Sequence, residues 1–167
     1  MNFQFYLEKL HNSENFKEFV KENKDAYFCS GFIILDKEGN ENKQHFDFYL
    51  PSKKKIFSFQ LEEGIKLVPV EILDKKVPEK ILSNPDFDFE EMEKLISERM
   101  EKENIKNKIQ KIIFSLQKLK EREFLVGTVF ISMMGLLKVN IDINNKTITH
   151  FEKKSFLDMM KITGKKK

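Results

Sequence analysis

Two alternating segments joined by a short turn constrain the fold more than any other feature of this sequence. Residues 45–50 and 56–61 each place an apolar side chain at every second position. A period of two is that of a β-strand with one buried face. If the turn comprises residues 51–54, Phe48 lies opposite Phe57, so the apolar faces of the two strands coincide. The sequence therefore predicts an antiparallel hairpin with one apolar and one polar face.

Five further segments have the composition of strands and continue this pattern. The segment at 27–35 is apolar almost throughout, which indicates a central strand covered on both faces. Pro69 cannot donate a hydrogen bond to a ladder and therefore predicts an edge strand. Short turns between consecutive segments predict a meander. Besides the hairpin, the expected strands are 27–35, 65–73, 124–133, 137–143 and 146–152.

The register of the last hairpin is predicted from its turn. Residues 144–145 are both Asn, which suits a two-residue type I′ turn with positive φ at both positions. That turn pairs Ile141 with Ile148. It also places His150 on the apolar face of its hairpin, opposite Val139.

Helices are expected before, between and after the groups of strands. The first two dozen residues carry two short apolar stripes, and Asn12 or Ser13 can cap the second helix. Asp88 begins an acidic capping box that opens a long helical stretch to about Lys120. Ser155 is expected to cap a short C-terminal helix, whose apolar residues are Phe156, Leu157, Met159 and Met160.

The long helical stretch contains two apolar stripes that do not align. At 100° per residue the stripe of its second half, from Ile105 to Leu119, is displaced by roughly 140° from that of the first half. A straight helix cannot present both stripes to one core. Either the helix breaks near 102–104, or its first half packs on something else, such as a second subunit. The first half is thus a possible interaction surface, made of Met92, Leu95, Ile96 and Met100.

Together these elements predict an α+β fold. We expect an antiparallel sheet of about six or seven strands, with helices packed on one face and a short C-terminal helix. Helix and strands follow in the same order at 14–61 and 105–152, which we interpret as two α-β-β-β meander units. Residues 1–162 are expected to form a single domain with a connector at about 74–87. A basic flexible tail follows at 163–167.

Few side chains are candidates for chemistry. Cys29, the single cysteine, lies in an apolar strand, where core packing explains it better than a reactive thiolate does. His45-x-Asp47 and His150-x-Glu152 have a spacing that two metal ligands could use. The predicted hairpins place these two pairs on opposite sides of the sheet, so we expect no metal site. The sequence contains no catalytic motif and no glycine-rich phosphate loop, and we assign no catalytic residue and no cofactor.

Charge and hydropathy bound the partners and the location. The chain has 30 Lys and Arg and 27 Asp and Glu, and the three terminal lysines account for the net charge of +3. No stretch is apolar enough to span a bilayer and no signal-peptide pattern occurs, so the expected location is the cytoplasm, without membrane insertion. The leading hypothesis is a non-catalytic protein-interaction module, a small adaptor or chaperone-like homodimer. The alternatives are an accessory protein bound to nucleic acid or the ribosome, and an enzyme whose site one sequence does not reveal.

Overall fold

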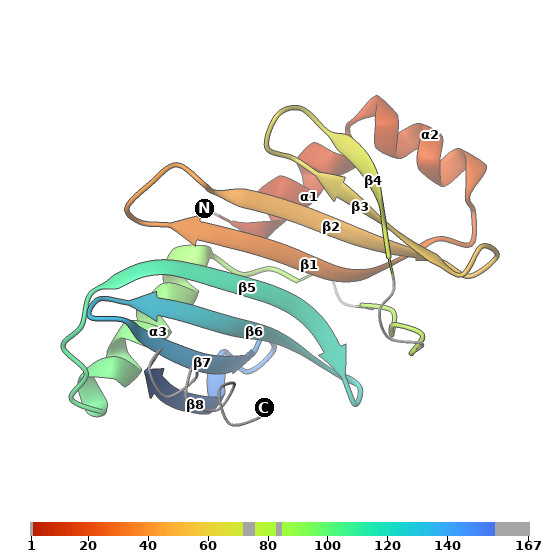
Figure 1. Cartoon of the computed structure of the whole chain (residues 1–167). Coiled ribbons are helices and arrows are strands. Elements are labelled where there is room, and N and C mark those ends of the chain that lie inside the picture. The colour runs from red at the N-terminus through yellow and green to blue at the C-terminus, as the bar shows by residue number, and fades with distance from the viewer. Residues whose placement is uncertain (1, 72–75, 83–84, 156–167) are drawn as a thin grey trace, which may run out of the picture.

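One antiparallel sheet forms the centre of the molecule. The computed structural model of the protein describes residues 2–71, 76–82 and 85–155 (Figure 1). The strands lie side by side in the order β4-β3-β2-β1-β5-β6-β7-β8, and every neighbouring pair except β1 and β5 is consecutive in the chain. Their bounds are β1 Tyr27–Asp36, β2 Lys43–Leu50, β3 Lys55–Gln60, β4 Lys66–Val70, β5 Ile109–Leu119, β6 Arg122–Ile131, β7 Gly135–Asp142 and β8 Thr147–Ser155.

The α+β class is confirmed, but the described sheet has eight strands instead of six or seven. The difference is β5, which the sequence predicted as the second half of a long helix. The helix ends at Lys102, where Asn104 adopts a positive φ of 56° and the Ile105 N–H donates to the Met100 carbonyl at 2.8 Å. Because a central strand carries apolar side chains on both faces, its pattern fits a helix as well as a strand.

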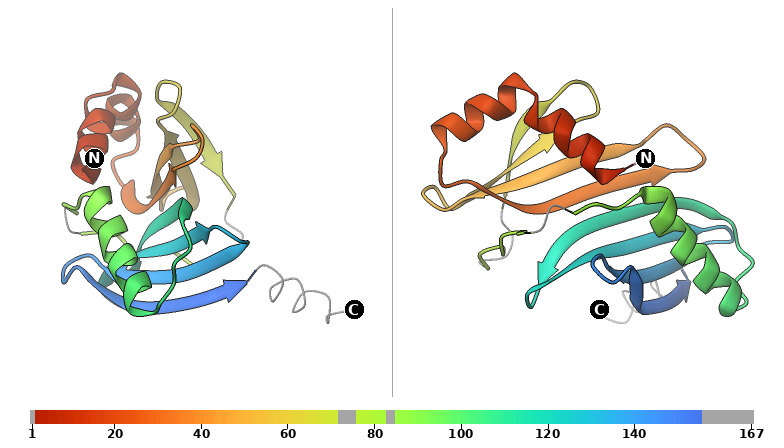
Figure 2. Two further views of the ribbon diagram at one scale, coloured as in Figure 1. Left: turned by 90° about the vertical axis from the view of Figure 1, so that its left-hand side faces the viewer. Right: turned by 180° about the vertical axis from the view of Figure 1, so that it is seen from behind.

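Three helices precede the two groups of strands: α1 Phe3–His11, α2 Glu14–Glu22 and α3 Phe89–Lys102. The Ser13 side chain caps α2 by accepting the Phe16 N–H at 3.2 Å, and Asp88 caps α3 by accepting the Glu90 N–H at 2.9 Å. Seen from behind, all three helices lie in front of the strands (Figure 2). We call the side of the sheet that they cover the inner face and the other side the outer face. Their packing differs from the expected one, because α3 does not continue past Lys102 and a strand takes the place of its second half.

A cluster of phenylalanines joins the helices to the inner face. Phe3 of α1 is fully buried, and its ring lies 5.3 Å from the ring of Phe46 and 4.9 Å from that of Phe87. The same ring covers Gly31, where a Cβ would lie 3.5 Å from it. A residue without a side chain in the middle of β1 therefore makes room for the aromatic ring that anchors α1.

The first hairpin has the predicted register. Phe48 pairs with Phe57 and His45 with Gln60. β4 contains Pro69 and lies at one edge of the sheet, as predicted. β1 is central as predicted, although the described helices cover its inner face only.

The last hairpin departs from the predicted register at one residue. Ile141 pairs with Ile148 as predicted, but a bulge follows, so that Asn140 pairs with His150 and Val139 with Phe151. The predicted type I′ turn is also wrong: Lys146 takes the positive φ, and neither residue of 144–145 does. The extra residue in β8 moves His150 from the inner face to the outer face.

The strand order has four strands on each side of the β1–β5 junction. The bounds predicted for two repeated units, 14–61 and 105–152, counted residues 105–120 as a helix. With β5 in that place, the equivalent halves are α1 to β4 and α3 to β8. Their origin by duplication and the single-domain boundary stay predictions. The predicted C-terminal helix and the tail at 163–167 lie outside the described residues.

None of the helices within residues 2–71, 76–82 and 85–155 is both long enough and apolar enough to cross a bilayer.

Candidate functional site

The stripe on α3 that the sequence singled out lies in the protein core. Met92 and Ile96 have no exposed surface, Met100 is 3 % exposed, and Leu95 packs against the same cluster. The stripe faces the inner side of the chain's own sheet. The apparent mismatch between two helical stripes came from treating β5 as a helix, and it disappears once β5 is a strand. The reason for placing a partner on α3 is therefore removed.

Among the described residues, no helix covers the outer face of the sheet (Figure 2). Its centre carries half-buried apolar side chains, which alternate with inner-face residues along β1, β5 and β6. Polar side chains flank them on both sides: His45 and Asp47 on β2, and Lys138 and Asn140 on β7. We call the apolar set the outer stripe; it consists of Phe32, Ile34, Ile113, Phe124, Val126 and Phe130.

Both histidine–carboxylate pairs lie on the outer face, which corrects the prediction that they lie on opposite sides. His45 Nε2 contacts the Glu62 carboxylate, and His150 Nε2 lies 3.5 Å from Glu152 Oε2. Four strands separate β2 from β8, so the histidines are about 24 Å apart at the usual spacing of about 4.8 Å per strand. Among the residues that the structure describes, no three His, Cys, Asp or Glu side chains lie close enough together to hold a metal ion.

Cys29 is buried, as the sequence indicated, and the structure places it at a bulge in β1. Its side chain is 4 % exposed, and its Sγ donates to the Asp47 carbonyl at 3.4 Å. Burial, and to a lesser degree the Asp47 carboxylate, raises the pKa of the thiol to about 12. The Asp47 carboxylate accepts a hydrogen bond from the Ser30 hydroxyl at 2.7 Å, whereas the thiol donates to the Asp47 backbone carbonyl. The arrangement suppresses thiolate chemistry.

This raised pKa leads to a testable result. At pH 8 we expect iodoacetamide to modify Cys29 in the folded protein roughly a thousandfold more slowly than in urea, since the thiolate fraction falls about tenfold for each unit of pKa. The contribution of the thiol to folding is fully present below its ordinary pKa of 9.0 and is lost as the pH rises from there toward 12. A Ser52→Cys variant in a Cys29→Ala background, with its thiol on an exposed turn, is the control. Equal rates for the two thiols would contradict the burial.

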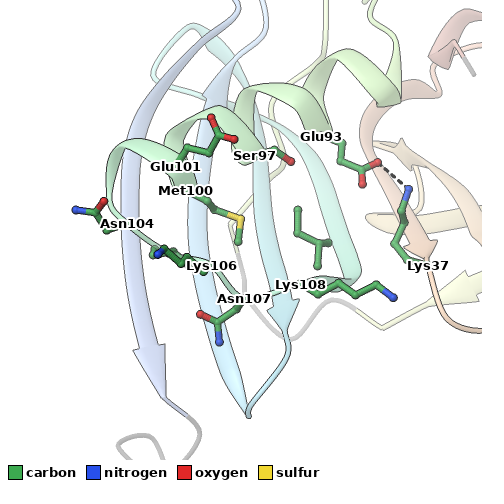
Figure 3. Close-up of a pocket in the computed structure, with 11 residues that line it drawn as sticks. Lys37, Glu93, Ser97, Met100, Glu101, Asn104, Lys106, Asn107 and Lys108 are labelled. Atoms are coloured by element: carbon green, nitrogen blue, oxygen red, sulfur yellow. Dashed lines mark hydrogen bonds and ion pairs between the residues drawn. The ribbon is translucent and has the colours of Figure 1, made fainter.

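A cavity of about 650 Å³ lies at the C-terminal end of α3 (Figure 3). Met100 lies at its floor, and Lys106 and Lys108 belong to the segment that leads into β5. Across the opening, the Lys37 ammonium pairs with the Glu93 carboxylate at 3.0 Å. The lining contains no histidine and no cysteine, and one of its two carboxylates is neutralised by Lys37. We assign no reaction to this cavity.

The two lysine-bearing turns do not combine into one basic surface. They lie at the β2–β3 and β7–β8 connections, about 24 Å apart at the usual strand spacing. Lys146 in the second turn is paired with Glu91 of α3 at 3.1 Å. This geometry weakens one of the two grounds for the nucleic-acid alternative; the other ground, the basic tail, lies outside the described residues.

The two edges of the sheet differ in how well they are protected. β4 has five residues and contains Pro69, which removes a donor from that edge. β8 has nine residues and no proline, and it is protected only by the bulge at 148–150 and by Lys153 and Lys154. Within the described part of the chain no strand pairs with its outer side. Sequence reasoning predicted this strand but missed its bulge, and so placed His150 on the wrong face. The signal was the spacing of Ile148 and Phe151, because residues an odd number apart share a face only across a bulge.

No protein-family model and no curated protein matches the chain. Among solved structures it is similar to a putative lipoprotein from Clostridium difficile 630, with a TM-score of 0.57 and 11 % sequence identity. The match covers 84 % of this chain and 91 % of that one. At this identity the likeness shows a shared fold and no more.

Proposed function

We propose that the chain is a non-catalytic protein-interaction module that acts as a homodimer. The observation that carries this proposal is the edge of β8, along which no strand of the described residues pairs. A long edge strand presents a row of backbone N–H and C=O groups, which can pair with a strand of another chain. β8 is the longer of the two edges and has no proline to block such pairing.

Two further features support an interaction module. The outer stripe has apolar side chains in its centre and polar side chains at its margins, which is the usual layout of protein interfaces. The one cysteine has its reactivity suppressed, and the histidine–carboxylate pairs are far apart on the sheet. These features are more typical of a binding surface than of a catalytic site.

Sedimentation velocity from low to high micromolar protein tests the proposal. We expect the mass to rise toward twice the 19.9 kDa of one chain. A mass that stays at one chain over the whole range would contradict it. Because the edge offers backbone groups, salt up to about 0.5 M is expected to weaken the dimer far less than it would weaken a complex held by surface charges.

We also propose a cytoplasmic location. The chain has one cysteine and therefore no internal disulfide framework, which is usual where thiols are kept reduced. The lipoprotein named above shares the fold at 11 % identity, too little to carry its location over. Fractionation of cells that express the full chain, followed by immunoblotting, would decide between cytosol and membrane.

A further inference from the structure

We propose that the segment 156–167 of this chain docks in a groove on the outer face of its own sheet. The groove lies at the end of the sheet where β1, β6 and β8 end, on the left in Figure 1. One end of the groove is apolar and the other is acidic, and the segment is apolar first and basic afterwards. This inference does not depend on the proposed homodimer.

Two adjacent cavities form the groove. One, of about 380 Å³, is lined mainly by apolar side chains, among them Phe130 and Met134. The other, of about 730 Å³, contains Ile113 and is bounded by residues 36–41, between β1 and β2. Phe130 and Gln110 line both cavities, so the two are continuous. The groove therefore runs across the strands, from the β6–β7 turn to the loop between β1 and β2.

The apolar end of the groove carries two exposed methionines on a strained turn. Met133 and Met134 are 91 % and 59 % exposed, and their φ angles are 62° and 58°. Asn and Gly are the usual residues in a two-residue turn with positive φ, because other side chains are strained there. Apolar side chains that are both exposed and strained give the folded chain no benefit unless other residues cover them. They therefore mark a contact surface.

The opposite end of the groove is acidic. Its lining contains three carboxylates, those of Asp36, Glu38 and Glu41, and one lysine. Lys111 Nζ lies 3.2 Å from Glu41 Oε2, so this lysine neutralises one of the three. The Asp36 carboxylate accepts three backbone N–H bonds from its own loop, at 3.0–3.2 Å, which hold it in place beside the groove. This end is therefore suited to a basic segment.

The sequence after Ser155 matches both ends of the groove in the right order. The apolar residues of the segment lie mainly at 156–160, and three lysines follow at 165–167. Ser155 pairs with Gly135, which lines the apolar end of the groove. The apolar residues therefore begin beside the exposed methionines, and the lysines come later, on the way to the acidic loop.

The segment is long enough to reach across the groove. β8 and β1 lie four strand spacings apart, which is about 19 Å. Residues 156–167 span about 18 Å as a helix and about 40 Å when extended. Because the segment is joined to the sheet beside the groove, its effective concentration there is in the millimolar range, which favours it over a separate molecule.

Disulfide formation between the segment and the groove tests the docking. In the full chain with Cys29→Ala, we expect Met134→Cys to form a disulfide with Met159→Cys roughly tenfold faster than Asn104→Cys does, because docking raises the local concentration of the two thiols. Asn104 is exposed at the same end of the sheet but on the helix side, and so is the matched control. Mass spectrometry of the oxidised chain measures the rates, and circular dichroism shows that each variant folds. Met133→Cys is a second position if Met134→Cys does not fold.

A charge reversal tests where the lysines lie. Glu38→Lys is expected to slow the disulfide between Met134→Cys and Met159→Cys by about two- to fivefold, the effect of one surface charge pair. Glu22→Lys makes the same charge change on the exposed side of α2, away from the groove, and should leave the rate unchanged.

Each outcome of these experiments decides a part of the proposal. A faster disulfide at Met134→Cys than at Asn104→Cys, formed within one chain, supports the docking. Equal rates would overturn it, and a disulfide found only between chains would assign the groove to a second copy instead. An unchanged rate in Glu38→Lys would overturn the placement of the lysines at 36–41. A chain that forms the disulfide but stays monomeric would contradict the homodimer alone.

Discussion

Replacing Phe3 by Ala is expected to lower the free energy of unfolding by about 3–5 kcal/mol, the usual cost of removing a buried aromatic ring. The Phe3 ring has no exposed surface and contacts the rings of Phe46 and Phe87. It also covers Gly31, which has no side chain with which to fill the space. Because the ring touches a helix, the sheet and the segment before α3, the cavity cannot close by a local shift. Urea unfolding followed by circular dichroism measures the change.

The neighbouring Phe5 provides the control for this prediction. Its side chain lies on the same helix and is 54 % exposed. Phe5→Ala is expected to change stability by less than about 0.5 kcal/mol, as is usual for surface substitutions. If both variants lose the same free energy of unfolding, the loss comes from weakening α1 as a helix and not from the ring contacts of Phe3.

Replacing Ile96 by Ala is expected to lower the free energy of unfolding by about 2–5 kcal/mol. Ile96 is fully buried between α3 and the inner face of the sheet, with Met92 one turn before it and Met100 one turn after it. The loss should be the same at low and high protein concentration, because the contacts lie within one chain. Chemical unfolding at two concentrations, twentyfold apart, measures this.

The Leu95→Ala variant provides the comparison for the stability loss of Ile96→Ala, and sedimentation velocity measures the dimer Kd of both. Leu95 lies next to Ile96 on α3 and is only partly buried, so Leu95→Ala should cost less. Neither substitution is expected to change the dimer Kd, since both lie on the core side of the chain. A weakened dimer with unchanged stability would return α3 to the role of an interface and contradict its burial.

Local patterns were enough to predict every described strand except β5. The Phe48–Phe57 register followed from alternation and turn length, and the edge position of β4 followed from Pro69. β5 was not predicted, because Ile112 and Ile113 point to opposite faces of a strand yet also fit one side of a helix. Alternation identifies a strand when one face is polar, and β5 is apolar on both.

The edge strand β8, the candidate interaction site, was harder to predict than the fold. Its key element is the bulge in β8, which turns His150 to the outer face beside Asn140. A single inserted residue reverses every side chain beyond it, so a register derived from the turn alone is correct only up to that residue. The burial of Ile96 could not be predicted either, because the helix that carries it was assigned the wrong length.

The junction between β1 and β5 has a consequence for how the chain folds. All the other strand pairs form between neighbours in the chain, whereas Gly31 must find Leu116 across the whole first half of the sheet. Closing so long a loop is slow, because its entropy is lost before the contacts form. We therefore expect the two meanders to assemble early, and their meeting along β1 and β5 to limit the rate of folding. Until then each half exposes a central strand as an edge, so newly made chains are most prone to pair with one another at the junction that is finally buried deepest.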